Sequence, residues 1–520
     1  MNVGCFADML RYNAYSFPNQ IALLEQERNV TYGQLNYEVN SFASGLQALN
    51  IKKGDHIACI LRNSIVFVAV YFAAAKIGAV LVPFNYFLKP TEWENLVGHC
   101  NPKLIICDTF FTDSLMSIES TRQIPVIWAG ENTPHGAFSY EEIINNRSKL
   151  EVHSPVKGKD VCNIIYTSGT TGSPKGVIRT HSNNLWANIQ MAHFSQYQRG
   201  EINLFIGPPF TMRFINIFSP AMFSGAEIIL MEEFDPEIVI RTIEEKKVNR
   251  LFLPPAYWED LINHERFNSY DKSNLKYIIT GTYTTPAELK QNLQEAFPSA
   301  SIFEIWGATE GGLIGSCPED IKRKPASIGL PMAFNDVKIL DERLQEVPHD
   351  KIGELAIRGP SVSDGYYKNT KTTGESLGKS GWFMTGDLAR ADKDGYLYIV
   401  DRKSEVINIG NFKIYPGEIQ HLLNYHPKVM ESLIFGLPSS SNAKFIAAAI
   451  VPRNGIHIPA DEINNYINGY IANYKKPKVI YFVDELPKTA TDKIIRCKEI
   501  HNSLALRKPD LVLEYPRELV

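Results

Sequence analysis

The residues from 166 to 177 carry the side chains best suited to chemistry, in the order Tyr-Thr-Ser-Gly-Thr-Thr-Gly-Ser-Pro-Lys-Gly-Val. Hydroxyl side chains alternate here with glycines, which let the backbone approach an anion closely and adopt positive φ. The freed amide groups, the hydroxyls and the ammonium of Lys175 would all donate to phosphate oxygens. The segment therefore predicts a loop that binds the phosphates of a nucleotide.

Two other interpretations of this loop are weaker. The common P-loop requires Gly-x-x-x-x-Gly-Lys-Ser/Thr before a helix, whereas Pro174 precedes the lysine here and Gly176 follows it. Most strings rich in glycine and serine are surface linkers. A linker is seldom preceded by a buried strand, yet the apolar run 161–165 leads directly into this loop. The phosphate-binding interpretation is therefore favoured.

Strands and helices alternate around the loop. Pro236 and Pro286 fit the first position of a helix, where proline is common. Short apolar runs predict strands at 57–61, 104–107, 161–167, 227–231, 250–253, 275–280 and 301–305, and helices are expected at 64–76, 236–246 and 286–296. This alternation is typical of an α/β architecture with mostly parallel sheets flanked by helices.

A domain boundary is expected near Asp401-Arg402-Lys403-Ser404. The chain beyond it has its own strand patterns at 432–436, 445–451 and 479–483. We therefore expect a large N-terminal domain at 1–401 and a small α+β C-terminal domain at 402–520, which is long enough to fold as a unit.

Further segments in the same order extend the pattern over nearly the whole chain. They are Thr-Tyr-Gly-Gln-Leu at 31–35, Gly-Ala-Val-Leu-Val-Pro at 78–83, Trp-Gly-Ala-Thr-Glu at 306–310, the glycine-rich stretch 353–367, Trp-Phe-Met-Thr-Gly-Asp at 382–387, Asp-Arg at 401–402 and Pro-Lys-Thr-Ala-Thr-Asp-Lys-Ile-Ile-Arg at 487–496. Together with the loop they resemble the adenylate-forming superfamily, which includes acyl- and aryl-CoA synthetases, peptide-synthetase adenylation domains and beetle luciferases.

The resemblance implies a role for each matching residue. Lys493, Glu310 and Thr309 would be catalytic, and Thr167 with Glu310 would hold Mg²⁺, because a carboxylate and a hydroxyl are suitable magnesium ligands. Trp306 offers an aromatic face to adenine, and Asp387 can accept protons from both ribose hydroxyls. The cofactor-binding residues would be Thr167, Ser168, Gly169, Thr170, Thr171, Gly172, Lys175, Thr282, Trp306, Gly307, Asp387 and Arg402.

The reaction implied by the resemblance has two halves and uses ATP, Mg²⁺ and CoA. A carboxylate attacks the α-phosphorus of ATP and pyrophosphate leaves, while Lys493 stabilises the growing negative charge. The small, mobile C-terminal domain then rotates, exchanging the lysine loop for the loop 408–414, and the CoA thiolate attacks the acyl-adenylate.

The acid and the thiol would contact segments that match the family pattern less closely. The residues expected to line the acid pocket are Phe210, Thr211, Met212, Arg213, Phe214, Tyr257, Gly281 and Tyr283. Those expected to accompany the thiol are Gly410, Asn411, Phe412, Lys413 and Lys475. Fatty, aryl and dicarboxylic acids all stay open as substrates, with Arg213 as the side chain that would meet a second carboxylate.

Several positions depart from the family pattern. Asp492 replaces the glycine before the catalytic lysine, Asn411 replaces a glycine, and Ser404 stands where the interdomain pivot is usually Asp or Lys. Thr211 takes the place of a histidine, and the segment 280–286 replaces the usual Ser-Gly-Gly-Ala-Pro-Leu-Pro. The pocket segments differ while the phosphate segments do not, which favours an unusual acid substrate.

Two alternatives belong to other functional classes. The acyl group could pass to a separate carrier protein or an amine, since no carrier domain follows in 520 residues. A non-enzymatic module that binds ATP or an adenylate would explain Asp492, Ser404 and Asn411, although the retained Lys493 and Glu310 argue against it. An amino-acid substrate is disfavoured, because no aspartate stands beside Phe210 to hold an α-amine.

Composition limits the remaining partners and the location. The net charge of −4 gives no reason to expect nucleic acid or an anionic membrane as a partner. Seven scattered cysteines without a Cys-x-x-Cys pair favour a reducing compartment. No basic segment precedes an apolar core at the N-terminus, and the apolar region 57–84 is interrupted by polar residues. We therefore expect a soluble cytoplasmic protein without a transmembrane segment.

Overall fold

The computed structural model describes residues 4–145, 150–153, 155–167, 175–377, 381–409, 412–438, 444–453, 456–468, 470–488 and 511–512. The chain divides into two compact units and passes between them several times. The first unit contains Met1–Lys338, Ala356–Thr385 and Asp394–Tyr398, and the second contains Ile339–Leu355, Gly386–Lys393 and Ile399–Val520.

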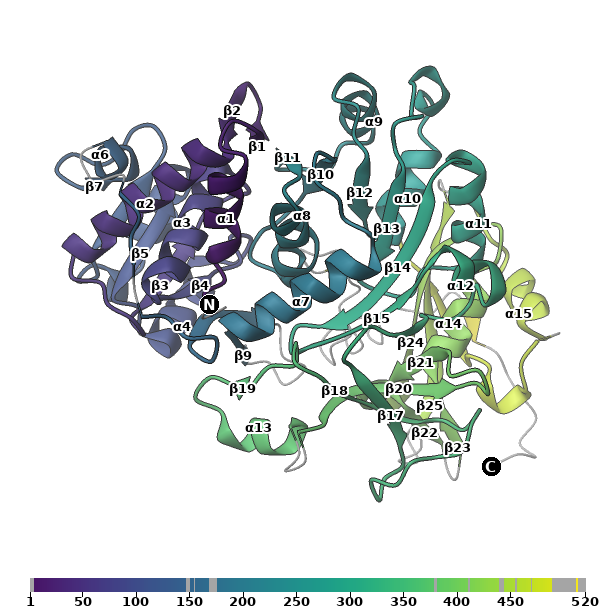
Figure 1. Cartoon of the computed structure of the whole chain (residues 1–520). Coiled ribbons are helices and arrows are strands. Elements are labelled where there is room, and N and C mark those ends of the chain that lie inside the picture. Colours follow the sequence, from purple (N-terminus) through teal and green to yellow (C-terminus); the bar gives the residue numbers. More distant parts are fainter. Residues whose placement is uncertain are drawn as a thin grey trace. The chain divides into compact units, whose positions relative to one another are not determined.

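The first unit is built on two large sheets (Figure 1). In its described part, one sheet has nine strands in the order β16 (Leu330–Pro331), β15 (Gly311–Ser316), β14 (Ser301–Ala308), β13 (Tyr277–Gly281), β12 (Arg250–Leu253), β10 (Ile202–Ile206), β11 (Glu227–Met231), β1 (Ile21–Glu25) and β2 (Arg28–Thr31). The other has eight, in the order β19 (Gly365–Tyr366), β9 (Lys175–Thr180), β8 (Val161–Thr167), β4 (Val80–Pro83), β3 (His56–Ile60), β5 (Leu104–Asp108), β6 (Val126–Ala129) and β7 (Phe138–Ser139). Their central strands are parallel.

Helices cover both faces of each sheet. The helices of this unit are α1 (Asp8–Ser16), α2 (Tyr32–Ala48), α3 (Ile65–Ile77), α4 (Pro90–Cys100), α5 (Thr112–Met116), α6 (Tyr140–Asn145), α7 (His181–Phe194), α8 (Ser219–Ser224), α9 (Pro236–Glu245), α10 (Pro255–Ile262), α11 (Ala287–Ala296), α12 (Pro318–Arg323) and α13 (Thr370–Ser376). One core cluster joins α2 and α3 to the eight-stranded sheet and α8 to the nine-stranded sheet. The outer face of the eight-stranded sheet packs against α4 and α5, and the outer face of the nine-stranded sheet packs against α9, α10 and α11. The α/β fold expected for the N-terminal part is confirmed.

Local sequence signals explain where these helices begin. Thr31 caps α2 through a reciprocal capping box with Gln34, so the segment 31–35 contains the start of a helix. Asp235 caps α9, with Pro236 at the first helical position as predicted. The predicted start of α11 at Pro286 is one residue early, because Thr285 is held in the preceding turn and Pro286 forms the N-cap.

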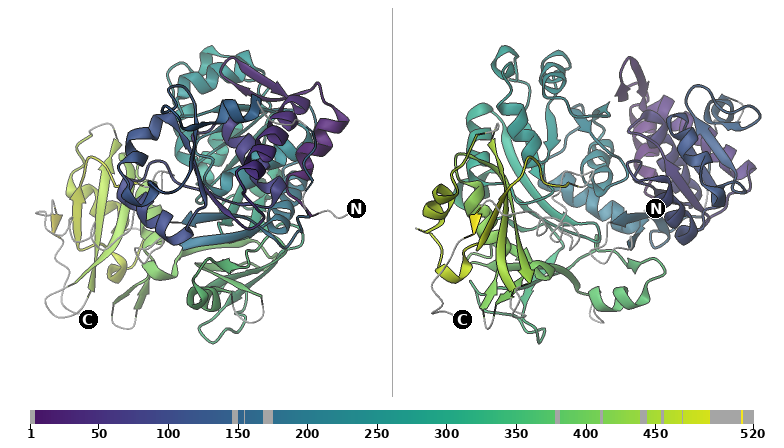
Figure 2. Two further views of the ribbon diagram at one scale, coloured as in Figure 1. Left: turned by 90° about the vertical axis from the view of Figure 1, so that its left-hand side faces the viewer. Right: turned by 180° about the vertical axis from the view of Figure 1, so that it is seen from behind.

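The second unit contains a separate α+β core (Figure 2, yellow-green). Its described sheet has the order β24 (Val429–Pro438), β25 (Lys444–Pro452), β26 (Val479–Phe482) and β27 (Leu511–Val512), and α14 (Pro416–Asn424) and α15 (Ala460–Asn468) contribute buried residues to the same core. A short ribbon joins β22 (Ile407–Ile409) to β23 (Phe412–Ile414). A further described sheet, whose strands contain residues assigned to both units, has the order β17 (Asp336–Leu340), β18 (Gly353–Arg358), β20 (Phe383–Ala391) and β21 (Leu397–Arg402). The expected small α+β domain is confirmed as a fold.

No described helix combines the length and the hydropathy that a membrane span requires.

Candidate active site

Strands β8 and β9 are antiparallel neighbours, and the two outer residues of the predicted phosphate loop lie at their loop-side ends. Thr167 pairs with Lys175, and the Thr167 hydroxyl lies 3.4 Å from the Lys175 carbonyl oxygen. A strand, not a helix, follows the loop, which is consistent with its difference from the common P-loop. The predicted residues Ser168, Gly169, Thr170, Thr171 and Gly172 lie outside the described residues.

Glu310 lies in the turn between β14 and β15, and three neighbours hold it there. The Tyr366 hydroxyl donates to Glu310 Oε1 at 2.5 Å. The Glu310 carbonyl accepts hydrogen bonds from the Ser363 amide at 2.6 Å and from the guanidinium of Arg179 at 3.3 Å. The Lys175 ammonium lies 5.7 Å from the centre of the Tyr366 ring. Lys175 and Glu310 are predicted site residues 135 positions apart in the sequence, and both lie next to Tyr366.

Arg179 is a wholly buried cation beneath this turn. Its guanidinium also donates to the Ser361 carbonyl at 2.8 Å and to Asn184 at 3.1 Å. Burial lowers the pKa of Arg179 to about 10. Gly311 must be glycine, because its φ is +107° and a Cβ there would lie 2.1 Å from the Ser361 carbonyl oxygen.

The predicted adenine segment lies at the carboxyl ends of β13 and β14. Strand β14 continues three residues beyond the predicted end at 305, so Trp306 lies within the strand and pairs with Ile314. Trp306 is half-buried and Gly307 is exposed. Gly281 pairs with Ile305, which places Thr282 beside Trp306. Thr309 is half-buried in the turn that follows β14.

Thr282 has a φ of +82°, which is strained for a β-branched residue. Its neighbours are fixed: the Thr285 amide donates to Glu304 Oε1 at 2.7 Å, and the Tyr283 hydroxyl accepts from the Ala256 amide at 2.9 Å. Such strained residues persist where the surroundings over-determine them, and they cluster at functional sites.

The predicted acid-pocket residues divide between one edge of the sheet and the core. Arg213 lies 5.5 Å over the Phe252 ring at β12, and Tyr257 stacks on Phe234 at 4.3 Å. Both follow carboxyl ends of parallel strands, as do Gly281 and Tyr283, and ligands of open α/β sheets bind at this edge. A π-helix at Phe214–Phe218 begins directly after Arg213, and such helices are frequent at functional sites.

The phenylalanines of that set are packed in core clusters. Phe214 is 1% exposed and stacks on Phe218, and it meets Phe67 edge-on. Phe210 is 7% exposed and contacts Tyr86. Thr211 and Met212 are half-buried, and the Thr211 hydroxyl donates to the Pro208 carbonyl. A role for Phe210 and Phe214 in lining a pocket therefore stays a prediction.

The second unit holds the predicted ribose-binding pair. Arg402 Nε lies 2.6 Å from Asp387 Oδ1, and the Asp387 side chain is 6% exposed. The predicted thiol-binding Lys413 and Lys475 form ion pairs with Glu342 and Glu418 at 2.7 and 2.8 Å.

Of the four other predicted residues in this part of the chain, the structure describes one. Phe412 begins β23, whereas Gly410, Asn411 and the catalytic Lys493 lie outside the described residues.

The residues present fit a magnesium ion held mainly by its nucleotide. Mg²⁺ usually binds to one or two carboxylates, waters and substrate phosphates. Within the described ranges, no group of three or more His, Cys, Asp or Glu side chains could hold a metal. Glu310 supplies one carboxylate whose Oε1 is engaged by Tyr366, and Thr167 stands at the loop-side end of β8.

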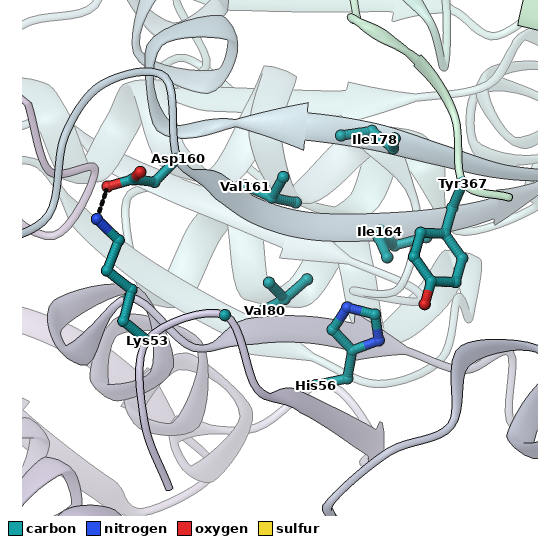
Figure 3. A pocket seen from close by; sticks show the side chains of 10 residues that line it. Lys53, His56, Val80, Asp160, Val161, Ile164, Ile178 and Tyr367 are labelled. Carbon is teal, nitrogen blue, oxygen red and sulfur yellow. Dashed lines mark ion pairs between the residues drawn. The ribbon is translucent and has the colours of Figure 1, made fainter. Parts of the chain in front are cut away.

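A cavity of about 210 Å³ lies elsewhere in the first unit (Figure 3). Lys53 and Asp160 form an ion pair of 2.6 Å at one end, and the rings of His56 and Tyr367 meet at 5.1 Å at the other. Apolar side chains of β4, β8 and β9 lie between them. The lining contains none of the predicted site residues, and Asp160 precedes the start of β8, about 20 Å along the strand from Thr167.

Comparison with known proteins agrees with this geometry. The sequence profile of the AMP-binding enzyme family matches residues 10–367, and that of the AMP-binding enzyme C-terminal domain matches residues 418–493. The chain is 30% identical to the indoleacetate–CoA ligase of Aromatoleum aromaticum (92% of this chain, 94% of the relative) and 29% identical to the feruloyl-CoA synthase of an Amycolatopsis species (92% and 95%).

A solved structure gives the same result. The anthranilate CoA ligase AuaEII, in complex with anthranoyl-AMP, matches with a TM-score of 0.88 and 26% identity over 96% of this chain and 97% of that one. The expectation of an AMP-forming ligase of the acyl-CoA synthetase type is confirmed. The chain belongs to the AMP-binding enzyme family.

Proposed function

We propose that this enzyme joins an aromatic carboxylic acid to CoA through an acyl-adenylate, with ATP and Mg²⁺. The observation that carries the proposal is the meeting of Lys175 and Glu310 around Tyr366, beside the strand ends that flank the phosphate loop. This arrangement brings a cation for phosphate and a carboxylate for magnesium to one place, as phosphoryl chemistry requires.

The residues would divide the work between binding and charge stabilisation. Thr167 and Lys175 would contact the phosphates, Glu310 would hold the metal, and Trp306 would stack on adenine. When bound, Mg²⁺ would neutralise phosphate charge. In the first half-reaction a carboxylate oxygen bonds to the α-phosphorus as the bond to pyrophosphate breaks. In the second, the thiolate sulfur of CoA bonds to the acyl carbon and AMP leaves.

The second unit would supply the remaining groups. Asp387 is suited to accept protons from ribose hydroxyls, with Arg402 at 2.6 Å keeping its carboxylate oriented. Lys493 would stabilise the charge that develops on the carboxylate and the α-phosphate. We propose that the chain from 402 onward moves between the two half-reactions, as such hinged domains do.

Two observations support an aromatic substrate. Aromatic rings gather at the carboxyl ends of the parallel strands, where Tyr257 stacks on Phe234 and Phe252 lies under Arg213. The named substrates of the three relatives are indoleacetate, ferulate and anthranilate, which all contain an aromatic ring. A flat apolar substrate would pack against such side chains by stacking.

A cytoplasmic location is also proposed, supported by the thiols. All six cysteines in the described part of the chain are free, and Cys59, Cys100, Cys107 and Cys162 are buried. Unpaired buried thiols are usual in a reducing compartment.

The test is product identification by mass. The purified protein is incubated with Mg·ATP and a panel of aryl, fatty and dicarboxylic acids, with and without CoA. Lys493→Ala is compared with Lys478→Ala, which removes an exposed lysine that directly precedes β26 and has no assigned role. The proposal predicts aryl-CoA and AMP, with a rate on the order of 10²–10³ lower only in Lys493→Ala. Formation of an acyl-AMP that does not react with CoA but reacts with an amine or a carrier protein would overturn the choice of CoA as the acceptor.

A further inference from the structure

Tyr366 links the two charged groups of the candidate site. The hydroxyl donates to Glu310 Oε1 at 2.5 Å, and the Lys175 ammonium lies 5.7 Å from the ring centre. A hydrogen bond to a carboxylate is short and strong compared with one between neutral groups. A cation within about 6 Å of an aromatic centroid is attracted by the ring. One side chain therefore contacts both an anion and a cation.

The backbone around Tyr366 leaves its ring little freedom. Strand β19 pairs with β9, so that Tyr366 lies opposite Val177, two residues beyond Lys175. The Tyr366 amide donates to the Thr373 hydroxyl at 3.0 Å. Gly365 has a φ of +137°, and a Cβ there would lie 2.5 Å from Thr373 Cγ2. Tyr366 itself is 7% exposed. The ring is thus fixed relative to the strand that carries Lys175.

The partner turn is fixed to the same segment. The Glu310 carbonyl accepts from the Ser363 amide at 2.6 Å, three residues before Tyr366, and from Arg179 of β9 at 3.3 Å. The backbone contacts therefore fix the position of the Glu310 main chain, and the hydrogen bond from the Tyr366 hydroxyl fixes the direction of its carboxylate. Because the hydroxyl engages Oε1, the Oε2 atom is the oxygen this contact leaves for a cation.

We propose that Tyr366 is a positioning residue that orients the Glu310 carboxylate toward magnesium and holds the Lys175 ammonium beside it. The inference rests on the proposed function, because it assumes that Glu310 contacts the metal. Partners that orient a metal ligand typically change metal affinity 10–100-fold when they are removed. A purely structural tyrosine would change stability and leave metal affinity alone.

The test measures metal binding directly as well as activity. Mn²⁺ replaces Mg²⁺ as the probe, and free Mn²⁺ is measured by electron paramagnetic resonance with α,β-methylene-ATP present. Tyr366→Phe keeps the ring and removes only the hydroxyl. The matched control is Tyr367→Phe at the adjacent tyrosine, whose ring packs against His56 and His99. Glu310→Gln and the double variant Tyr366→Phe/Glu310→Gln complete a cycle, and the melting temperature of each variant reports on folding.

The expected result is a loss of Mn²⁺ affinity of about ten-fold in Tyr366→Phe, with less than a two-fold change in Tyr367→Phe. Tyr366→Phe should have no further effect once Glu310 is Gln, because the tyrosine acts through that carboxylate. Unchanged affinity in Tyr366→Phe beside a loss in Glu310→Gln would overturn the positioning role and leave the proposed function intact. Unchanged affinity in Glu310→Gln would overturn the metal role of Glu310, and the positioning role with it.

Discussion

Lys290→Met removes one partner of a buried ion pair that supports the turn containing Thr282. Lys290 Nζ lies 2.5 Å from Glu304 Oε2, and both side chains are 1% exposed. Glu304 Oε1 accepts from the Thr285 amide, and Lys290 also donates to the carbonyls of Pro325 and Ser327 at 2.6 and 3.3 Å. The pair therefore connects α11 and β14 to the 280–286 turn.

The size of the effect follows from this burial. Water cannot screen a pair at 1% exposure, so loss of the lysine leaves an uncompensated carboxylate. Breaking such a pair costs roughly 3–5 kcal/mol, out of a total stability of about 5–15 kcal/mol. The control Lys276→Met changes an exposed lysine nearby and should stay within about 0.5 kcal/mol of the natural protein.

The stability of Lys290→Met should also depend on pH. Burial raises the pKa of the Glu304 carboxyl, and Lys290 opposes this rise. Between the unfolded and folded pKa values the folded chain binds more protons, so stability falls as pH rises through this window. Removing Lys290 raises the pKa of the Glu304 carboxyl in the folded chain further. The pH range over which stability falls therefore extends to higher pH. The variant should therefore regain stability when the pH is lowered toward the unfolded value of the carboxyl.

The assay is urea unfolding followed by tryptophan fluorescence at several pH values, with Glu304→Gln and the double variant included. The double variant should be less destabilised than the sum of the single ones, because it buries no unpaired charge. A free energy of unfolding unchanged in Lys290→Met, or strictly additive losses, would refute the reasoning.

Three smaller changes test other parts of the fold and site. Thr282→Gly should raise the free energy of unfolding by about 1 kcal/mol in urea, because it relieves a strained φ of +82°; a loss of stability would contradict the strain. Trp306→Leu should weaken ATP binding about ten-fold in calorimetry through lost stacking, while Trp306→Tyr should stay within a few-fold; equal effects would exclude stacking. Thr31→Ala should cost about 1 kcal/mol in urea by removing the cap of α2, with no change in the KM for ATP; an unchanged midpoint would show that the cap contributes nothing.

The strands of the first unit could be predicted closely from the sequence. Strands buried on both faces are continuous apolar runs, and β8, β11 and β12 begin and end where they were expected. The end of β14 could not be predicted, because Gly307 and Ala308 carry no strand signal of their own and are ordered by pairing with β15.

The contacts between the site residues could not be predicted from the sequence, because they join segments that are far apart along the chain. Tyr366 and Glu310 are separated by 56 positions, and nothing in either local sequence shows that a turn and a short edge strand meet. Lys290 has the sequence context of an exposed helix lysine, yet it is buried against Glu304. The expected boundary at 401 stays a prediction, since the second compact unit also takes in Ile339–Leu355 and Gly386–Lys393.

The central claim is that a carboxylate oxygen attacks the α-phosphorus of ATP. It is tested most directly with an aromatic acid labelled with ¹⁸O in its carboxylate, in the presence of Mg·ATP and CoA, followed by mass spectrometry of the AMP. If an acyl-adenylate forms, each AMP released carries one ¹⁸O atom from the acid. AMP without the label, or ADP with labelled phosphate, would contradict an acyl-adenylate intermediate.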